Sequence, residues 1–254
     1  MSERLHDTTG GMGRGSRRNS HGMVASMIPQ ASILVLLVAT LLPLCAWGGE
    51  IQGRVVVAGD LPAAKKVPIT IDQYVCGTEQ AMGDLIISAA REIRNVVVWL
   101  ENPPPGAPSA PPRPVTPVDQ KECVFVPRVV IVPAGGTVEF LNSDRLLHNL
   151  HSVSRDNAAF NRTQPKDRTI PITFAKPEIV RIDCDLHSWM RGWVVVAPHP
   201  FYALSDAQGR FTLDNVPPGQ YTVRVWHERL GESSRPVTVP ATGPAPLTIE
   251  LRGR

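Results

Sequence analysis

Three side chains that can bind a soft metal ion occur close together between residues 184 and 190. Cys184 offers a thiolate, His187 an imidazole and Met190 a thioether, and two residues separate each donor from the next. Copper sites that exchange single electrons combine two imidazoles and one thiolate with a weak, distant thioether. One tight loop can present three of these four donors, so we expect this segment to bind copper.

His148 can supply the missing imidazole, because it follows a glycine-rich turn and an apolar run of strand character. The expected ligands of one copper ion are therefore His148, Cys184, His187 and Met190. Taken singly, these residues could be a packed thiol, surface imidazoles and a core methionine. However, only Met82 and Met190 follow the first 48 residues, and one of them falls on the ligand spacing.

His151 complicates this ligand set, because it lies three residues after His148. An odd offset reverses the side-chain direction on an extended strand, so the two imidazoles should face opposite ways. We favour His151 as an imidazole outside the ligand set. The alternative is a modified or second metal site that uses His148 and His151 together.

The cysteines form an odd set once the N-terminal segment is set aside. Of four cysteines, Cys45 lies in that segment, which leaves Cys76, Cys123 and Cys184. An unpaired cysteine in an exported protein requires an explanation. The simplest is a Cys76–Cys123 disulfide with Cys184 held as a metal thiolate, and the alternative is a buried free thiol at Cys184.

Residues 1–48 have the features of a signal peptide. An apolar run at 33–44 follows a polar head with several arginines, and Ala46 and Gly48 are small residues at the positions that a signal peptidase reads. We therefore expect a periplasmic or secreted protein. The apolar run is at the short limit for a membrane span, so an uncleaved N-terminal anchor, with membrane contact, is the alternative.

The charge of the chain gives no sign of a nucleic-acid partner. The net charge is +3, of which +2 belongs to residues 1–48, and this leaves +1 for the rest. A nucleic-acid-binding domain normally carries a basic stripe. The sequence also lacks an obvious Ser/His/Asp or paired-carboxylate arrangement, so we do not expect an enzyme.

The rest of the chain predicts an all-β fold. Short alternating or β-branched runs recur between Gly, Pro, Asn and Asp residues, and no long helical periodicity interrupts them. The expected strands are 51–57, 95–100, 128–132, 137–141, 149–153, 170–174, 178–183, 192–196, 210–213, 221–226, 236–239 and 247–251. Residues 103–117 contain eight prolines and should form an extended surface loop.

These patterns divide the chain after the signal peptide into three blocks: an N-terminal β block at 49–118, a metal-binding block at 119–198 and a C-terminal β block at 199–254. The last block is marginal as an independent core, so we expect it to complete one sandwich with the N-terminal block. The middle block would then be an insertion. It is short of strands, and a further one could come from residues 95–100.

The middle block resembles the cupredoxin family. The resemblance rests on the His148-Asn149 pair upstream and on the Cys/His/Met loop before the last strand, with the spacing of amicyanin-like members. It implies a Greek-key β-sandwich with one type 1 copper ion. It also implies that Asn149 ties the His148 strand to the Cys184 loop and donates toward the thiolate.

Two residues depart from the cupredoxin pattern. Asp185 places a carboxylate beside the thiolate, which would shift the reduction potential, and Ser188 stands where similar loops commonly have proline. These departures concern the colour and the reduction potential of the site, and we expect copper binding despite them.

The C-terminal block resembles the carboxypeptidase regulatory-like, transthyretin-like sandwich. The resemblance rests on the turn and strand pattern of 205–213 and 216–225, and 51–57 is similar to the first strand of such domains. It implies a fold and no activity of its own.

Together these observations predict an exported one-electron carrier with a mononuclear copper site. Its partner would be a redox protein of the periplasm that docks near Trp189. The alternative is a copper-binding or storage module, or a structural interaction module, without redox turnover.

Overall fold

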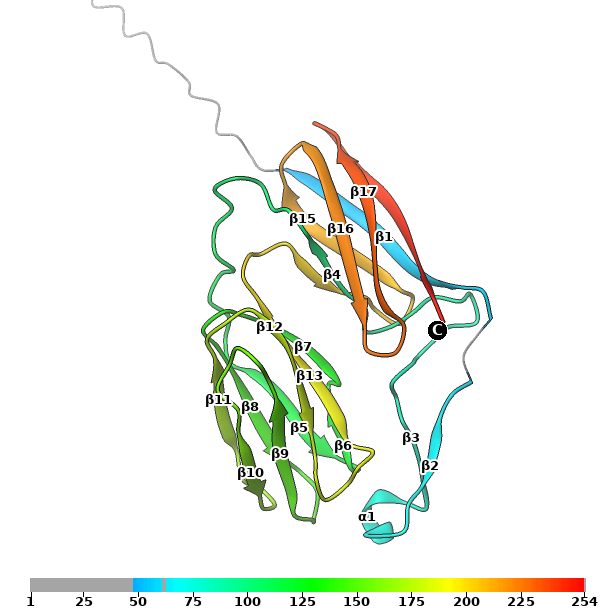
Figure 1. The fold of residues 1–254 in the computed structure, drawn as a ribbon, viewed down its shortest axis with the longest axis vertical. Helices are drawn as coiled ribbons and strands as arrows, with labels where there is room; N and C mark the ends of the chain where they lie inside the picture. The colour runs from blue at the N-terminus through cyan, green and yellow to red at the C-terminus, as the bar shows by residue number, and fades with distance from the viewer. Residues whose placement is uncertain (1–47, 61–62, 254) are drawn as a thin grey trace, which may run out of the picture. The chain divides into compact units, whose positions relative to one another are not determined.

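The computed structural model describes residues 48–60 and 63–253, so nearly all of the expected signal peptide, with Cys45, lies outside the described residues. The described part contains eighteen strands and one helix of four residues, which confirms the all-β prediction (Figure 1). Within these residues, no helix has the length and apolar character needed to span a membrane.

The middle of the chain forms a sandwich of two sheets around one apolar core. Its five-stranded sheet has the order β10 (Asn161–Gln164), β9 (His148–Val153), β12 (Glu178–Asp183), β13 (Arg191–Ala197) and β7 (Val129–Pro133). Its four-stranded sheet has the order β11 (Ile170–Phe174), β8 (Gly136–Asn142), β5 (Thr116–Lys121) and β6 (Val124–Val126). Alternate residues of each strand enter the core, as Val138 and Phe140 do on β8.

A second sandwich combines the two ends of the described chain. Its three-stranded sheet is β15 (Arg210–Val216), β1 (Gly49–Ala58) and β18 (Pro244–Arg252), and its four-stranded sheet is β14 (Tyr202–Leu204), β4 (Val97–Leu100), β16 (Gly219–His227) and β17 (Gly231–Val239). Strand β1 is central, antiparallel to β15 and parallel to β18. The prediction that the terminal blocks share one sandwich, with the middle block inserted, is confirmed.

Two details of the strand assignment were wrong. Strand β4 does not join the middle block, because it pairs with β14 and β16 and sends Val98 and Leu100 into the core of the second sandwich. The middle sandwich instead uses β5, which runs parallel to β8. The block boundary predicted after residue 118 therefore cuts through β5.

A hairpin that the sequence did not predict projects from the N-terminal block toward the middle sandwich. We call residues 63–84 the arm; it contains β2 (Lys66–Pro68), α1 (Gln73–Cys76) and β3 (Glu79–Ala81) (Figure 1). The expected Cys76–Cys123 disulfide is present and joins α1 to the turn between β5 and β6. Cys184 is the free cysteine among the described residues, and it is buried.

Candidate metal centre

Three of the predicted ligands meet at one point inside the middle sandwich. The Nδ1 atoms of His148 and His187 are 3.0 Å apart, and the Sγ atom of Cys184 lies 4.0 Å and 3.6 Å from them, respectively. All three side chains are buried. These donor atoms form a compact group that could hold a metal ion.

The strand register explains why these distant residues converge. Strands β12 and β13 pair up to Asp183 and Arg191, so residues 184–190 must form the loop between them. Backbone hydrogen bonds from Cys184 N–H to Met190 O and from Met190 N–H to His187 O close this loop. Strand β9 is the other neighbour of β12, and its first residue, His148, therefore lies at the same end of the sheet.

The donor geometry fits a single metal ion. Metal–nitrogen and metal–sulfur bonds of about 2.0–2.3 Å place neighbouring donor atoms roughly 3–4 Å apart around one ion. The three separations fall in or at the edges of this range. Both Nδ1 atoms face the thiol, while the opposite Nε2 atoms are engaged by carboxylates. Each imidazole thus directs Nε2 at a carboxylate and presents Nδ1 toward the thiol, as a metal ligand would.

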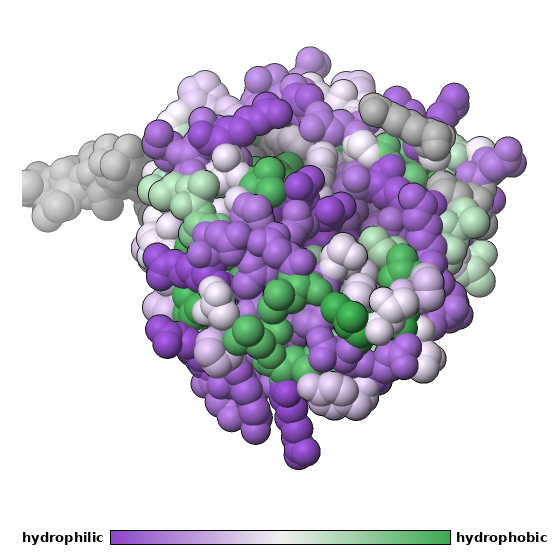
Figure 2. Space-filling view, turned by 60° about the horizontal axis from the view of Figure 1, so that its bottom comes forward, coloured by the Kyte–Doolittle hydropathy of each residue, from purple (hydrophilic) through white to green (hydrophobic). Residues whose placement is uncertain are grey.

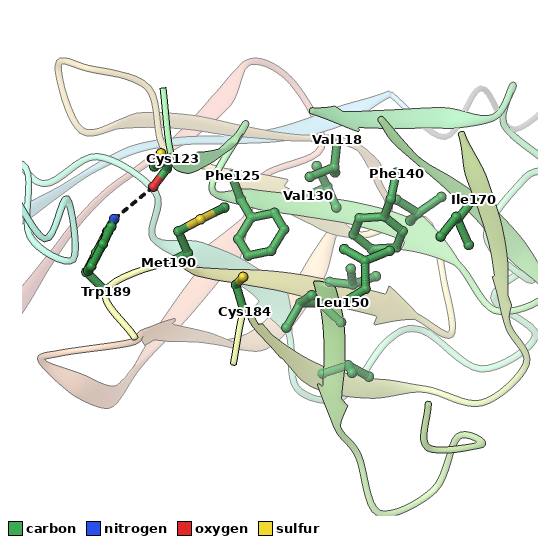
Figure 3. Packing of buried hydrophobic residues seen from close by; sticks show 14 of the residues in the cluster. Val118, Cys123, Phe125, Val130, Phe140, Leu150, Ile170, Cys184, Trp189 and Met190 are labelled. Carbon is green, nitrogen blue, oxygen red and sulfur yellow. Dashed lines mark hydrogen bonds between the residues drawn. The ribbon is translucent and has the colours of Figure 1, made fainter. Parts of the chain in front are cut away.

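Met190 lies at the apolar side of this group. It is buried, and it belongs to the core cluster that also contains Cys184 and Phe125. Figure 3 shows the two sulfur-bearing side chains entering this cluster. The role of Met190 as a fourth ligand stays a prediction.

Two carboxylates that the sequence reasoning missed hold the imidazoles from behind. Asp144 Oδ2 is 2.9 Å from His148 Nε2, and the same carboxylate accepts hydrogen bonds from the backbone N–H groups of Glu122 and Cys123. Asp72 Oδ2 is 3.1 Å from His187 Nε2. Asp144 stands four residues before His148, which is a usable signal, whereas nothing in the sequence links Asp72 to a residue 115 positions later.

The site also prepares its thiol for metal binding. Burial raises the pKa of Cys184, but hydrogen bonds with His148, His187 and the backbone N–H of Asn149 outweigh this and lower it to about 6. Burial lowers the pKa of His148, but the bonds to Asp144 and Cys184 raise it to about 9. Cys184 is therefore largely a thiolate at neutral pH, which is the form that binds metals.

Asn149 connects the strand of His148 to the loop of Cys184. Its Oδ1 accepts a hydrogen bond from the Asp185 backbone N–H at 2.6 Å, and its Nδ2 donates to the Asp185 carboxylate at 3.0 Å. Asp185 is thereby turned toward Asn149 and toward His151, whose Nδ1 lies 2.8 Å from the carboxylate. The structure does not bring His151 into the donor group, and it is partly exposed to solvent.

The docking surface that we predict near Trp189 is not formed by Trp189 itself, because this side chain is buried. The Trp189 side chain is 9 % exposed, and its indole N–H donates to Cys123 O at 3.1 Å (Figure 3). The exposed apolar residues next to the ligands are instead Leu147 and Leu186. Figure 2 shows an apolar area bordered by polar residues on the lower end of the molecule as Figure 1 presents it.

Residues 193–252 match the family model described as carboxypeptidase regulatory-like domain. This match confirms the predicted resemblance of the C-terminal block. It begins within β13, which belongs to the middle sandwich in this structure. A search of curated protein sequences found no match.

Solved structures similar to this chain include several copper proteins. A copper-containing nitrite reductase from Thermus scotoductus SA-01 is 28 % identical over 36 % of this chain, with a TM-score of 0.31. This chain spans about a quarter (24 %) of that reductase. A purple cupredoxin from Nitrosopumilus maritimus is 20 % identical over 32 % of this chain and 99 % of its own length (TM-score 0.29).

An amicyanin variant in its oxidised state is 28 % identical to this chain, with a TM-score of 0.30. The likeness covers 32 % of this chain and 81 % of amicyanin. These likenesses are partial, so the candidate metal centre rests on its own donor atoms: one thiol sulfur and two imidazole nitrogens, buried together.

Proposed function

We propose that this protein is an exported one-electron carrier that holds a single copper ion at His148, Cys184, His187 and Met190. The observation that carries the proposal is the buried group of two Nδ1 atoms and one Sγ atom with separations of 3.0–4.0 Å. A thiolate with two imidazoles is the donor set of electron-transfer copper sites, and a thioether at the fourth position favours Cu(I).

The surrounding residues are suited to keep the donor atoms in place during electron transfer. Bound copper would supply the one-electron couple between Cu(I) and Cu(II). Asp144 and Asp72 fix the planes of the two imidazoles, and Asn149 ties the strand of His148 to the loop of Cys184. Donors that are fixed from several sides move little when the charge changes, which favours fast transfer.

An exported location and a protein partner complete the proposal. The Cys76–Cys123 disulfide supports an oxidising compartment such as the periplasm. A redox protein would dock on the exposed apolar residues Leu147 and Leu186, which flank two of the ligands in the sequence. An apolar area bordered by polar residues, as on the face that Figure 2 shows, is typical of a binding site.

A copper-storage role without redox turnover is the second candidate, and the burial of His187 favours it. His187 is 1 % exposed, so neither imidazole presents an edge to a partner at the surface. A closed site of this kind retains metal well. It gives electrons no direct exit through an imidazole.

Loading of the purified protein with Cu(II) distinguishes these functions. An electron carrier should show intense thiolate-to-copper absorption in the visible range, bleached reversibly by ascorbate. Cys184→Ser should abolish the band, because it removes the thiolate that generates it. Copper binding without the band would support storage, and no copper binding would leave a structural module.

A further inference from the structure

The arm closes the metal centre on the side of His187. Asp72 Oδ2 lies 3.1 Å from His187 Nε2, and His187 is 1 % exposed while the Asp72 side chain is 37 % exposed. The carboxylate therefore stands between the imidazole and solvent. It is the arm's polar contact to the candidate ligands.

The local geometry of Asp72 shows that this contact is not a by-product of helix capping. Asp72 occupies the N-cap position of α1, where an aspartate normally accepts a hydrogen bond from a helix N–H. Here its side chain makes no capping bond, and its backbone is left-handed (φ 51°, ψ 30°). That conformation is unfavourable for a residue with a side chain, although aspartate tolerates it better than most. Asp72 thus has an unfavourable backbone conformation in the arm, and in this conformation its carboxylate contacts His187.

The arm is fastened to the middle sandwich on both sides of Asp72. Ile69 and Cys76 are buried in the core cluster of that sandwich, and the Cys76–Cys123 disulfide makes one connection covalent. Gln80 Nε2 donates to Glu122 O at 2.8 Å. These contacts hold Asp72 over the site, so it is a fixed partner of His187.

We propose that Asp72 is a positioning residue for His187, and that the arm is a tethered cover that slows metal exchange. This inference rests on the proposed copper site. When a metal binds Nδ1, the Nε2–H group donates a hydrogen bond to the Asp72 carboxylate, which fixes the orientation of the ring and raises the basicity of Nδ1. The negative charge beside the site stabilises Cu(II) more than Cu(I), and the arm blocks chelators from the imidazole edge.

Two variants of Asp72 and one matched control test the proposal. Asp72→Ala removes the hydrogen-bond acceptor, and Asp72→Asn keeps an acceptor oxygen without the charge. Glu79→Gln is the control, because Glu79 is an exposed carboxylate on the same arm that pairs with Lys66. The measurements are Cu(II), Cu(I) and Co(II) affinities by chelator competition, the rate of copper removal by excess chelator, and thermal unfolding of the metal-free proteins.

Asp72→Ala should weaken Cu(II) binding by about 10–100-fold, the range found when the partner of a ligating histidine is removed. Cu(I) binding should weaken less. A tenfold change in the ratio of the two affinities raises the reduction potential by ~59 mV. Chelators should remove copper faster, Asp72→Asn should recover part of the Cu(II) affinity, and Glu79→Gln should stay within about twofold of the parent protein.

The proposal fails if Asp72→Ala matches Glu79→Gln in affinity, potential and removal rate. It also fails if both Asp72 variants lose Cu(II) and Cu(I) affinity equally and only in proportion to reduced stability, because that pattern indicates a structural role. Cobalt separates this outcome from the function of the site. If the parent protein lacks the visible copper band but Asp72→Ala still weakens Co(II) binding, the proposed role of Asp72 and the arm stands and the proposed electron-carrier function is wrong. A parent protein that binds no metal overturns both.

Discussion

The two sandwiches bury polar side chains in different ways. In the second sandwich, buried polar residues bond to the backbone or to side chains nearer the surface. The Ser205 hydroxyl donates to Ile93 O and accepts from Val96 N–H, and the Glu92 carboxylate accepts from Arg54 and Ser88. In the middle sandwich they form a connected set that reaches the metal centre. The buried members of that set are Gln120, Gln164, Asn142, Asp144, His148 and His187.

The connections in the middle sandwich can be followed bond by bond. Gln120 Nε2 donates to Gln164 Oε1, Asn142 Nδ2 donates to Gln164 O, and Asn142 Oδ1 accepts from Asp144 N–H. Asp144 then bonds His148. Buried polar groups destabilise a core unless they are hydrogen-bonded, and a connected network favours one arrangement. In this network Gln120 Oε1 is the atom left without a partner among the described residues. The middle sandwich thus contains connected polar side chains where apolar packing would otherwise be possible, and these side chains hold the candidate site in place. The core of the second sandwich consists mainly of apolar side chains.

Breaking the network at Asp144 should have the largest effect. Asp144→Ala leaves His148 buried without its partner, and removal of one member of a buried pair costs about 3–5 kcal/mol. Chemical denaturation should show this loss, and copper titration should show weaker binding. Asp156→Ala, an exposed aspartate in the same sandwich, is the control and should change the unfolding free energy by less than ~0.5 kcal/mol.

The same leucine-to-alanine substitution in each core tests whether the two sandwiches differ in their effect on copper binding. Leu150→Ala and Leu213→Ala each remove a fully buried leucine, one per sandwich, and each should cost about 2–5 kcal/mol in unfolding free energy. Only Leu150→Ala should also weaken copper binding, because Leu150 lies two residues from His148 on β9. Equal loss of copper affinity in both variants would contradict the conclusion that only the middle sandwich positions the metal ligands.

Two carboxylates that fix turns allow a comparison of pH dependence. Glu178, in the middle sandwich, accepts hydrogen bonds from the Ser154 hydroxyl and from backbone and side-chain N–H groups of 155–157. Burial raises the pKa of Glu178, but these bonds lower it to about 2. Its contribution is therefore complete above the ordinary value of 4.5 and is lost as the pH falls toward 2.

Glu178→Gln should accordingly cost about 1.5–3 kcal/mol at neutral pH, and it should flatten the fall of stability between pH 4.5 and 2. Asp206→Asn, at the exposed turn of the second sandwich, should cost less, because solvent competes for its bonds to Arg210. Unfolding free energies measured across this pH range test both expectations.

The smallest effect on stability is expected for a substitution of His151, and it tests whether His151 is a metal ligand. His151→Ala removes a partly exposed imidazole that contacts Asp185 and not the donor group, so stability should change by less than ~0.5 kcal/mol. The visible copper band should keep its position and intensity. A shifted or lost band would return His151 to the ligand set.

Much of the fold could be predicted from the sequence, because long strands with one buried face show alternation. Strands β12 and β16 are clear in this way. The short strands β10 and β14 escaped, since three or four residues carry no readable period. The arm escaped for another reason: its structure depends on a disulfide and on packing against a distant sandwich.

The site shows the same limit. His148, Cys184 and His187 could be found because metal ligands have restricted chemistry and the loop keeps two of them close in sequence. Asp144 was missed although its position four residues before His148 is a signal, because an aspartate has many ordinary roles. Asp72 could not be assigned, because only the folded chain brings it to His187. The three-dimensional fold, and not a fixed separation along the sequence, determines which residues orient a metal ligand.

The central position of β1 has a consequence for the order of synthesis. This strand leaves the ribosome first among the described strands, yet its neighbours are β15 and β18, which begin at Arg210 and Pro244. Every strand of the middle sandwich is made in between, so that sandwich can close while β1 still lacks both partners. Since domains generally fold as units, the middle sandwich can fold before the second one, and the nine-residue strand β18 is the last to pair with β1.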